Sequence, residues 1–153
     1  MILSTPDPAL DRAFAAALLR LQHDAYRTQA ELIGSDRLAA LAADEDTLPT
    51  WRGRYLVAWE RTQLVGAVAW RPGEIVDVDR VMVDPTARRR GVGAALIQSV
   101  LDAAGSRAVQ TATGRDNSPG IALYRRFGFE PVDDEQAPTG IWITRLRRDP
   151  RQR

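Results

Sequence analysis

The sequence contains no cysteine, no lysine and one histidine, His23. Without cysteine there is no thiol nucleophile, no thiolate zinc site and no disulfide framework. Without lysine there is no Schiff-base chemistry, and a single histidine excludes a histidine-rich metal centre. His23 lies in a helical stretch rich in alanine and leucine, where a surface or packing position accounts for it. We therefore predict no metal site and assign His23 no role.

Net charge and long apolar runs are also lacking. The 21 arginines are nearly balanced by 20 acidic residues, so the net charge of +1 gives no reason to expect a nucleic acid or a membrane as partner. No stretch of 18 apolar residues occurs, and the N-terminus has no basic region followed by an apolar run. We expect a soluble, cytoplasmic protein. Its 153 residues are enough for one domain, spanning residues 1–153.

The spacing of apolar residues divides the chain into helices and strands. Three- and four-residue spacing predicts a helix from Asp7 to Ile33, whereas residues 35–50 are mixed and fit a short helix or a loop. The expected strands, of which the first three form an antiparallel meander, are Arg54–Trp59, Leu64–Trp70, Ile75–Val83, Ala108–Ala112, Phe129–Val132 and Gly140–Leu146. The other expected helices are Arg90–Ala104 and a short one that starts at Asn117 or Ser118 and stops at Gly128. The basic tail, residues 147–153, is expected to be mobile.

The most informative segment runs from Val81 to Gly93, where a strand leads through a basic turn into a helix. A helix N-terminus presents unpaired backbone N–H groups and a partial positive charge, and both suit a phosphate. Gly91 and Gly93 leave room for that phosphate, although each costs about 1 kcal/mol of helix propensity. Three consecutive arginines before Gly91 add charge that a pyrophosphate can neutralise. The segment therefore predicts a diphosphate-binding turn.

The spacing within this turn excludes two common phosphate motifs. No Gly-Lys-Ser/Thr follows, as a P-loop requires, and the third glycine of the dinucleotide fingerprint is missing. The pattern Arg88-x-x-Gly91-x-Gly93 after Val83-Asp84-Pro85 instead resembles the signature of the GCN5-related N-acetyltransferase (GNAT) family. The resemblance covers Leu56 to Leu146 and includes a second motif, Asn117, Leu123-Tyr124 and Phe127-Gly128-Phe129.

This resemblance implies an α/β fold with a mostly antiparallel, splayed central sheet flanked by helices. It also implies acetyl-coenzyme A (acetyl-CoA) as cosubstrate, bound by a core at residues 54–146, with residues 1–50 forming a helical region on the acceptor side. Two features depart from the family pattern: Gly120 stands where alanine is common, and the expected first strand is barely visible in Met1 to Thr5.

The resemblance further implies which residues hold the coenzyme. The strand ending at Val83 would splay from the following strand, so that its freed backbone pairs with the pantetheine arm as an added strand does. Asn117 would bond the same arm, although it is equally suited to cap a helix, and the two roles are compatible. The expected coenzyme-binding residues are Val81, Met82, Val83, Arg88, Arg89, Arg90, Gly91, Val92, Gly93, Ala94 and Asn117.

Tyr124 is similar to the family tyrosine that protonates the departing thiolate, because a phenol can donate a proton within hydrogen-bond reach. The alternative is a packed aromatic side chain, which its spacing from Ile121 and Phe127 also permits.

An amine must lose a proton when it attacks a thioester, so a carboxylate or an ordered water should lie nearby. Asp77 and Asp79 are the candidates, because in an alternating strand both share a face with Val81 and Val83. The family often carries an acidic base on this strand, at the position that Asp77 matches best. Alternatively, one or both carboxylates pair with a surface arginine, among which Arg80 and Arg71 are nearest in sequence.

These inferences predict an N-acetyltransferase in which a primary amine of a small molecule or peptide attacks the thioester directly, in a ternary complex. Candidates for the acceptor pocket are Tyr26, Glu31, Trp51 and Trp70, with structural packing as the alternative. A homodimer is possible. Two rivals are a non-catalytic acyl-CoA sensor of the same fold and a nucleic-acid binder that uses the arginines around Arg88 and at residues 145–153, which the neutral net charge disfavours.

Overall fold

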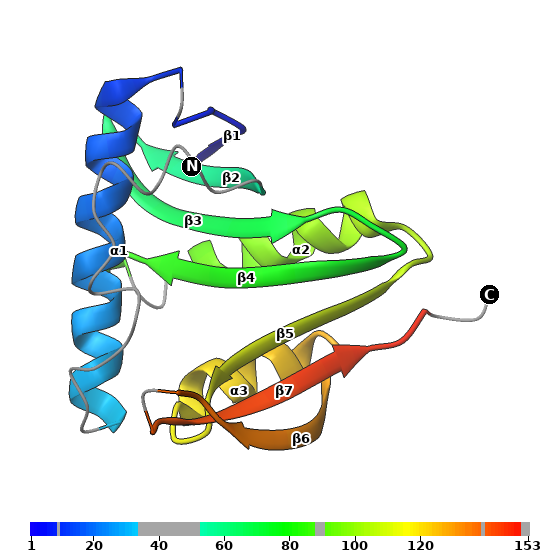
Figure 1. Ribbon diagram of the computed structural model, residues 1–153. Coiled ribbons are helices and arrows are strands. Elements are labelled where there is room, and N and C mark those ends of the chain that lie inside the picture. The colour runs from blue at the N-terminus through cyan, green and yellow to red at the C-terminus, as the bar shows by residue number, and fades with distance from the viewer. Residues whose placement is uncertain (9, 34–52, 88–90, 139, 151–153) are drawn as a thin grey trace.

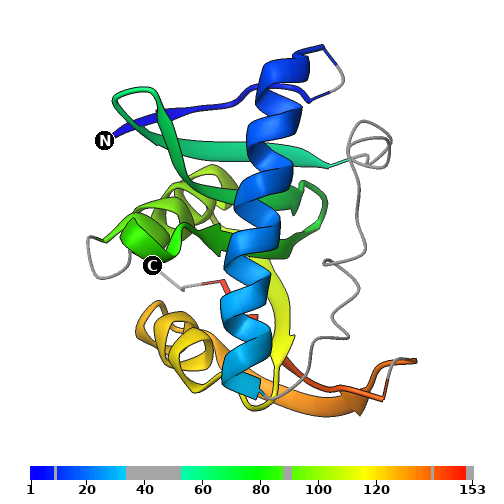
Figure 2. The same ribbon diagram turned by 90° about the vertical axis from the view of Figure 1, so that its left-hand side faces the viewer.

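The computed structural model describes residues 1–8, 10–33, 53–87, 91–138 and 140–150. A seven-stranded sheet with the order β1-β2-β3-β4-β5-β7-β6 forms its centre, with α1 on one face and α2 and α3 on the other (Figure 1, Figure 2). The strands are β1 (Ile2–Ser4), β2 (Arg54–Glu60), β3 (Gln63–Arg71), β4 (Ile75–Val83), β5 (Ala108–Gly114), β6 (Glu130–Gln136) and β7 (Trp142–Arg148). The helices are α1 (Arg12–Ile33), α2 (Val92–Ala104) and α3 (Ser118–Arg126). The predicted α/β fold with a mostly antiparallel sheet is confirmed.

The predicted meander is present as β2, β3 and β4, each antiparallel to the next. β2 and β3 are joined through a tight turn at Arg61, which has a φ of 56°. The first strand, barely visible in the sequence, is real but short, and Ser4 accepts a hydrogen bond of 2.9 Å from the indole N–H of Trp59 in β2. The Ser4 hydroxyl thus helps to hold β1 against β2, although the sequence of β1 has little of the alternation expected of a strand.

α1 begins at Arg12 rather than at the predicted Asp7. The carboxylate of Asp11 accepts a hydrogen bond of 3.0 Å from the amide of Phe14, so Asp11 caps the helix and fixes its start. The apolar stripe of α1 is buried against the meander in a cluster that contains Phe14, Leu18, Leu21, Tyr55, Val57, Leu64, Ala67, Ala69 and Met82. Residues 35–50, which the sequence left between helix and loop, lie outside the described residues.

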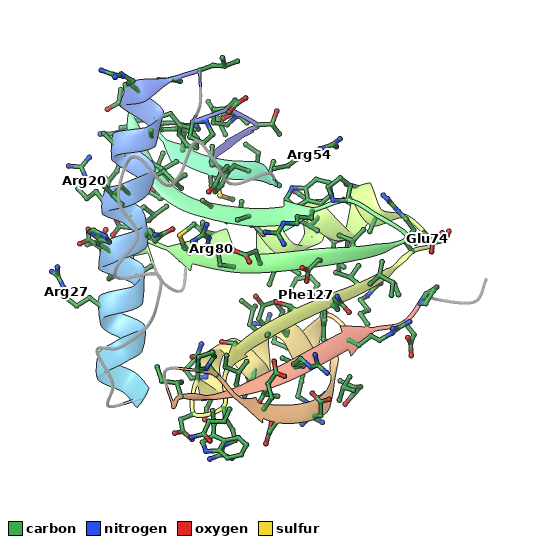
Figure 3. The ribbon with its side chains drawn as sticks, in the orientation of Figure 1. Arg20, Arg27, Arg54, Glu74, Arg80 and Phe127 are labelled. Carbon is green, nitrogen blue, oxygen red and sulfur yellow. The ribbon has the colours of Figure 1, made fainter. Side chains whose placement is uncertain are left out.

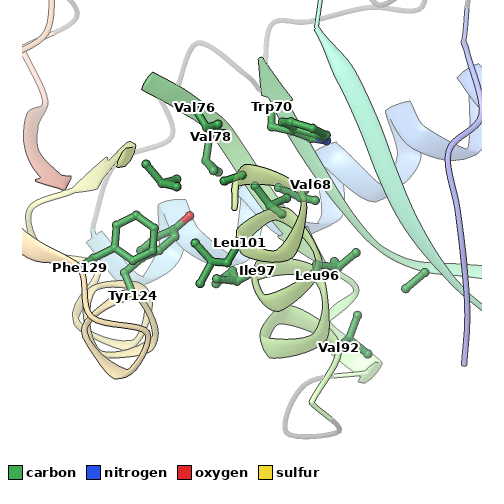
Figure 4. Packing of buried hydrophobic residues seen from close by; sticks show 14 of the residues in the cluster. Val68, Trp70, Val76, Val78, Val92, Leu96, Ile97, Leu101, Tyr124 and Phe129 are labelled. Carbon is green, nitrogen blue, oxygen red and sulfur yellow. The ribbon is translucent and has the colours of Figure 1, made fainter. Parts of the chain in front are cut away.

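α2 begins at Val92, two positions after the predicted start at Arg90, because Gly91 adopts the left-handed conformation with a φ of 77°. Its predicted apolar face is confirmed as the centre of the second core cluster, which Figure 4 shows packed under the sheet. At the other end, the amide of Gly105 donates a hydrogen bond of 3.1 Å to the Leu101 carbonyl, and its φ of 62° turns the chain away from the helix.

β6 shows where the apolar pattern is a poor guide. All its residues are exposed, and the strand is longer than the predicted Phe129–Val132. β6 is a strand because it pairs with β7 over most of its length. Arg145 strengthens this pairing with two hydrogen bonds of 2.8 and 2.9 Å to the Asp133 carboxylate. β7 itself continues to Arg148, past the predicted end at Leu146, and the last residues of the predicted tail, 151–153, lie outside the described residues.

Candidate active site

The sheet opens between β4 and β5. These strands are parallel and paired only from Ile75 and Ala108 to Val78 and Thr111. Beyond this point they diverge toward the end of the sheet that α1 crosses (Figure 1). On its other edge β4 stays paired with β3 as far as Val83. The backbone edge of β4 from Asp79 to Val83 therefore has no neighbouring strand among the described residues, and the predicted splay is confirmed.

A bulge in β4 lies at the point where the strands part. Ala69 is opposite Arg80 and Trp70 is opposite Val78, so Asp79 is an extra residue in β4. The bulge reverses the alternation of side chains: Val76 and Val78 belong to the core cluster under α2, and beyond the bulge Val81 and Val83 pack against the same cluster.

This reversal corrects one prediction. Asp77 does not share a face with Val81 and Val83, because its neighbours Val76 and Val78 take the α2 side and leave Asp77 on the α1 side. Asp79 occupies the bulge itself. The sequence could not reveal this, since strict alternation was assumed through a strand that contains one additional residue.

Asp77 is half-buried and lies in register between Arg71 of β3 and Gln110 of β5. Burial raises the pKa of its carboxyl, and the negative charge of Asp79 raises it further. The charge of Arg71 and a hydrogen bond with Gln110 counteract part of this increase. A carboxylate with a raised pKa is a better proton acceptor than an ordinary surface aspartate, so Asp77 stays a candidate base.

Asp79 is engaged in an ion pair, as the alternative reading allowed. Its carboxylate lies 3.2 Å from Nε of Arg80. Arg80 also donates a long hydrogen bond of 3.5 Å to the hydroxyl of Tyr55, a buried residue of β2. Arg80 lies in the part of β4 that is no longer paired with β5, beside α1 (Figure 3). The sequence analysis named Arg80 as a possible partner of these carboxylates, whereas Tyr55 was not singled out.

Tyr124 lies under the parting strands. It projects from α3 with its hydroxyl toward Val78 (Figure 4), is 6% exposed, and packs edge-on against Phe129 with ring centroids 5.3 Å apart. Burial raises the pKa of Tyr124 to about 12, although a hydrogen bond with Thr111 counteracts part of this effect. The packing reading of Tyr124 is therefore confirmed, and its role as the acid stays a prediction.

The turn after β4 is built by Asp84. Its carboxylate accepts bonds of 2.8 Å from the amide and 2.7 Å from the hydroxyl of Thr86, within a short 3₁₀ turn at Pro85–Ala87. Burial by itself would raise the pKa of Asp84, but the bonds from Thr86 and Gln63 hold it below its usual range. These bonds hold the backbone in the turn that leads from the end of β4 toward the predicted phosphate turn.

The predicted phosphate turn is described only in part, because Arg88, Arg89 and Arg90 lie outside the described residues. Gly91 is the N-cap of α2 and no side chain caps it. A Cβ at Gly91 would meet no atom within 4 Å among the described residues, its chain neighbours aside. Its glycine is thus explained by the positive φ, and the open space above it is what a bound phosphate requires. The next residues, Val92, Gly93 and Ala94, supply the amides of the first helical turn.

Gly93 is explained by packing. A Cβ there would lie 3.3 Å from Leu123 of α3 and 3.5 Å from Val83 of β4, so α2 and α3 approach closely at the open end of the splay. Asn117 caps α3, with its side chain accepting a bond of 3.3 Å from Gly120 and donating one of 3.0 Å to Thr113. The capping reading of Asn117 is therefore confirmed, and its contact with pantetheine stays a prediction.

The acceptor-pocket candidates are only partly described. Trp70 is buried in the cluster under α2 and so has the packing role. Trp51 and the side chains of Tyr26 and Glu31 lie outside the described residues.

A separate pocket of about 280 Å³ lies on the α1 side. It includes none of Asp77, Asp79 and Tyr124, and we assign it no role. Its walls are formed by Ala17, Arg20, Leu21, Asp24, Trp59, Thr62, Gln63, Leu64 and Asp84. Among the described residues there is no cluster of three or more residues suited to hold a metal ion, and no helix with the length and apolar character needed to cross a membrane.

The acetyltransferase (GNAT) domain family matches residues 51–131, which is more than half of the 153 residues. The chain belongs to the GNAT family. The matched segment contains both the parted strands and the glycine turn.

Two of the sequence relatives are acetyltransferases by name. The chain is 33% identical over 78 residues to an N-acetyltransferase of Methanocaldococcus jannaschii, covering 49% of this chain and 33% of that protein. It is 38% identical over 56 residues to the N-alpha-acetyltransferase RimI of Mycobacterium tuberculosis, covering 37% of this chain and 35% of that protein. The UPF0157 protein YqkA of Bacillus subtilis is 25% identical over 136 residues, covering 88% of this chain and 40% of that protein. The chain thus spans 33 to 40% of the length of these curated relatives.

Solved structures share the fold over nearly the whole chain. The ribosomal-protein-S18-alanine N-acetyltransferase of Escherichia coli matches with a TM-score of 0.76 at 15% identity, covering 99% of this chain and 95% of that one. The yncA protein of Salmonella typhimurium, solved with its cofactor acetyl-CoA, matches with a TM-score of 0.74 at 17% identity, covering 100% and 95%. PaiA N-acetyltransferase of Thermoplasma acidophilum, in complex with coenzyme A, matches with a TM-score of 0.72 at 14% identity, covering 97% and 99%. At these identities the likeness shows the fold.

Proposed function

We propose that the protein transfers an acetyl group from acetyl-CoA to a primary amine by direct attack in a ternary complex. The observation that carries this proposal is the end of β4–β5 pairing at Val78 and Thr111, with the Tyr124 phenol directed at that point. A donor thioester can enter where the strands part, and the Tyr124 phenol is a proton donor on the α3 side of this point.

The donor fits the residues that surround the opening. The free edge of β4 from Asp79 to Val83 can pair with the amide groups of an extended pantetheine arm, as an added strand would. Gly91 and the first turn of α2 lie at the far end of that edge, where amides and a helix dipole suit a pyrophosphate. The relatives solved with coenzyme A or acetyl-CoA support this choice of donor.

The residues have separate roles in the reaction. The amine approaches from the α1 side, where Asp77, with its raised pKa, accepts the amine proton directly or through water. The nitrogen forms a bond to the carbonyl carbon, the carbon–sulfur bond breaks, and Tyr124 donates a proton to the leaving thiolate. Asp79 keeps Arg80 in place and raises the pKa of Asp77.

The acceptor class is an amine of a small molecule or of a peptide N-terminus. Similar structures include a ribosomal-protein-alanine N-acetyltransferase of Brucella melitensis and Arabidopsis thaliana Naa50 bound to a bisubstrate analogue that joins coenzyme A to a short peptide. These neighbours support a peptide amine as the first acceptor to test.

The direct test is thiol release from acetyl-CoA in the presence of a panel of amines that contains peptide N-termini, polyamines, amino acids and aminoglycosides. Acetylated product should form with at least one acceptor. Coenzyme binding without turnover for every amine would favour the non-catalytic sensor, and no binding of acetyl-CoA at millimolar concentration would contradict the proposal.

A further inference from the structure

The bulge in β4 places a cation beside the candidate base. Asp77 is opposite Arg71 of β3. Arg80 is opposite Ala69, which stands two residues before Arg71 in the same strand. Positions two apart in a strand share a face and lie about 7 Å from each other. Without the extra residue Asp79, Arg80 would point to the opposite face from Asp77. The bulge therefore makes Arg80 the next side chain after Asp77 on the α1 side.

Contacts with two strands fix Arg80 on this side. Ala69 is opposite Arg80 on one edge and opposite Tyr55 of β2 on the other, and both Ala69 and Tyr55 are buried in the cluster that packs against α1. Arg80 donates the hydrogen bond of 3.5 Å to the Tyr55 hydroxyl, and its Nε lies 3.2 Å from the carboxylate of Asp79. The guanidinium is thus oriented by the protein itself, beside α1 (Figure 3).

Arg80 and Asp77 lie on either side of the point where the sheet opens. The pairing of β4 with β5 ends at Val78, so Asp77 is just before the opening and Arg80 just beyond it. The Arg80 side chain is 15% exposed, and it is therefore largely shielded from water and still within reach of a ligand. A charge in such a position attracts an opposite charge more strongly than one in open solvent.

The four charged side chains gathered here are balanced in charge. Two aspartates, Asp77 and Asp79, stand beside two arginines, Arg71 and Arg80. A protonated amine alone would bring a net positive charge into this partly buried site, which is costly. An amine that carries its own carboxylate brings no net charge, and its two groups match an aspartate and an arginine that are neighbours on one face.

We propose that Arg80 binds a carboxylate of the acceptor while the amine of the same molecule faces Asp77, so that Arg80 determines acceptor specificity. The inference rests on the proposed function and narrows its acceptors to amines with a carboxylate close by. An α-amino acid has both groups on one carbon atom, and a peptide that begins with aspartate has them one carbon further apart. A guanidinium has five N–H groups, so it can bind a carboxylate together with other oxygen acceptors.

The test uses two pairs of acceptors that differ in one carboxylate. The first pair is alanine and alaninamide, and the second is a tripeptide amide that begins with aspartate and its counterpart that begins with asparagine. We expect kcat/KM, corrected for the fraction of neutral amine, to be about 10- to 100-fold higher for the acid of at least one pair. A preference within the first pair assigns a free amino acid, and one within the second assigns a peptide N-terminus. The absence of a preference in both pairs would overturn the proposal.

Three variants assign the preference to one side chain. Arg80→Gln should abolish it, and Arg80→Lys, which keeps the charge beside Asp79 but lacks the planar fork, should retain part of it. Arg71→Gln is the matched control, because it removes an equal charge on the other side of Asp77, away from the opening, and should keep the preference. A preference that persists in Arg80→Gln, or that Arg71→Gln loses to the same extent, would contradict the proposal.

A second measurement needs no turnover. The same four compounds are titrated calorimetrically into the protein with and without coenzyme A. The acid should bind about 10- to 100-fold more tightly than its amide, and Arg80→Gln should remove this difference. Equal affinities for acid and amide, or failure of both acids to bind, would overturn the proposal. If no amine is acetylated in any assay, the proposed function fails, while these titrations still decide whether Arg80 binds a carboxylate.

Discussion

The side chain of Asn117 occupies the space that a Cβ on Gly120 would need. A Cβ built at Gly120 would lie 2.5 Å from Nδ2 of Asn117 and 3.0 Å from its Cγ. The glycine that departs from the family pattern is thus coupled to the conformation of the cap, in which Asn117 bends over the first turn of α3. With alanine at this position the asparagine must swing away from the helix.

Gly120→Ala is expected to change stability little while it moves Asn117. Alanine gains up to about 1 kcal/mol of helix propensity, and the lost cap costs about 1 kcal/mol, so the two effects nearly cancel. Asn117→Ala, which loses the cap alone, should be destabilised by about 1 kcal/mol. Thermal unfolding of both variants measures this difference. Stabilisation of Gly120→Ala by the full gain in helix propensity, about 1 kcal/mol, would show that Gly120 has no such coupling to the cap.

Tyr124→Phe should lower kcat by about 10² to 10⁴ while the dissociation constant for coenzyme A stays nearly unchanged. The phenyl ring keeps the edge-on packing against Phe129, so only the hydroxyl is lost. Steady-state kinetics combined with calorimetric titration of coenzyme A tests both parts. A wild-type rate in Tyr124→Phe would show that Tyr124 has only a structural role.

Asp79→Asn should move the acidic limb of the pH–rate profile to lower pH. After burial, the charge of Asp79 is the next cause that raises the pKa of Asp77, so neutralising Asp79 lowers that pKa and keeps Asp77 deprotonated further into acid. The profile of kcat/KM should be recorded with the same acceptor for both proteins, so that the ionisation of the amine contributes equally to both profiles. A limb that does not move would exclude Asp77 as the base.

Asp77→Asn should stabilise the protein at neutral pH. The pKa of Asp77 is raised in the folded state, so its charged form is disfavoured by folding and the penalty is present above the folded pKa. As the pH falls through that pKa, the carboxyl becomes neutral and the wild type approaches the variant. Denaturant unfolding at neutral and acidic pH measures the difference, which should shrink on acidification. The same variant should also lose acetyl transfer.

Gly91→Glu should weaken binding of coenzyme A, because a carboxylate at the N-terminus of α2 repels phosphate and occupies its space. Gly105→Glu is a matched control at the other end of the same helix. Both glycines have a positive φ, and the strain is larger at Gly105, with a ψ of −121°, than at Gly91, with a ψ of 13°, so backbone strain cannot explain a loss of affinity confined to Gly91→Glu. Only the first should lose affinity, by at least about tenfold for one repelled charge-assisted contact. Equal affinities in a titration would contradict the phosphate turn.

The site could be predicted from the sequence where a local pattern carries it. The glycine turn lies between a strand and a helix that are both apparent from their apolar periods, and β4 ends at Val83 as predicted. Tyr124 could be found because its motif is short and continuous in the chain. The hydrogen bond from Thr111 to the Val78 carbonyl, where the strands part, could not be predicted, since a lone threonine in a strand carries no signal until β4 lies beside it. Asp11 and Asn117 are an intermediate case. Both residue types are typical helix caps, but only Asn117 was predicted to be one, and the start of α1 was therefore placed too early.

By itself the sequence determined the class of fold, the order of its elements and the chemistry that is absent, because composition and periodicity are properties of neighbouring residues. Only the tertiary structure decided which way the carboxylates of β4 point. Whether Asp77 faces the same side as Val81 depends on one extra residue at position 79, and that residue is recognisable only from the register between β4 and β3. A bulge is fixed by pairing with a distant strand, which no local pattern contains.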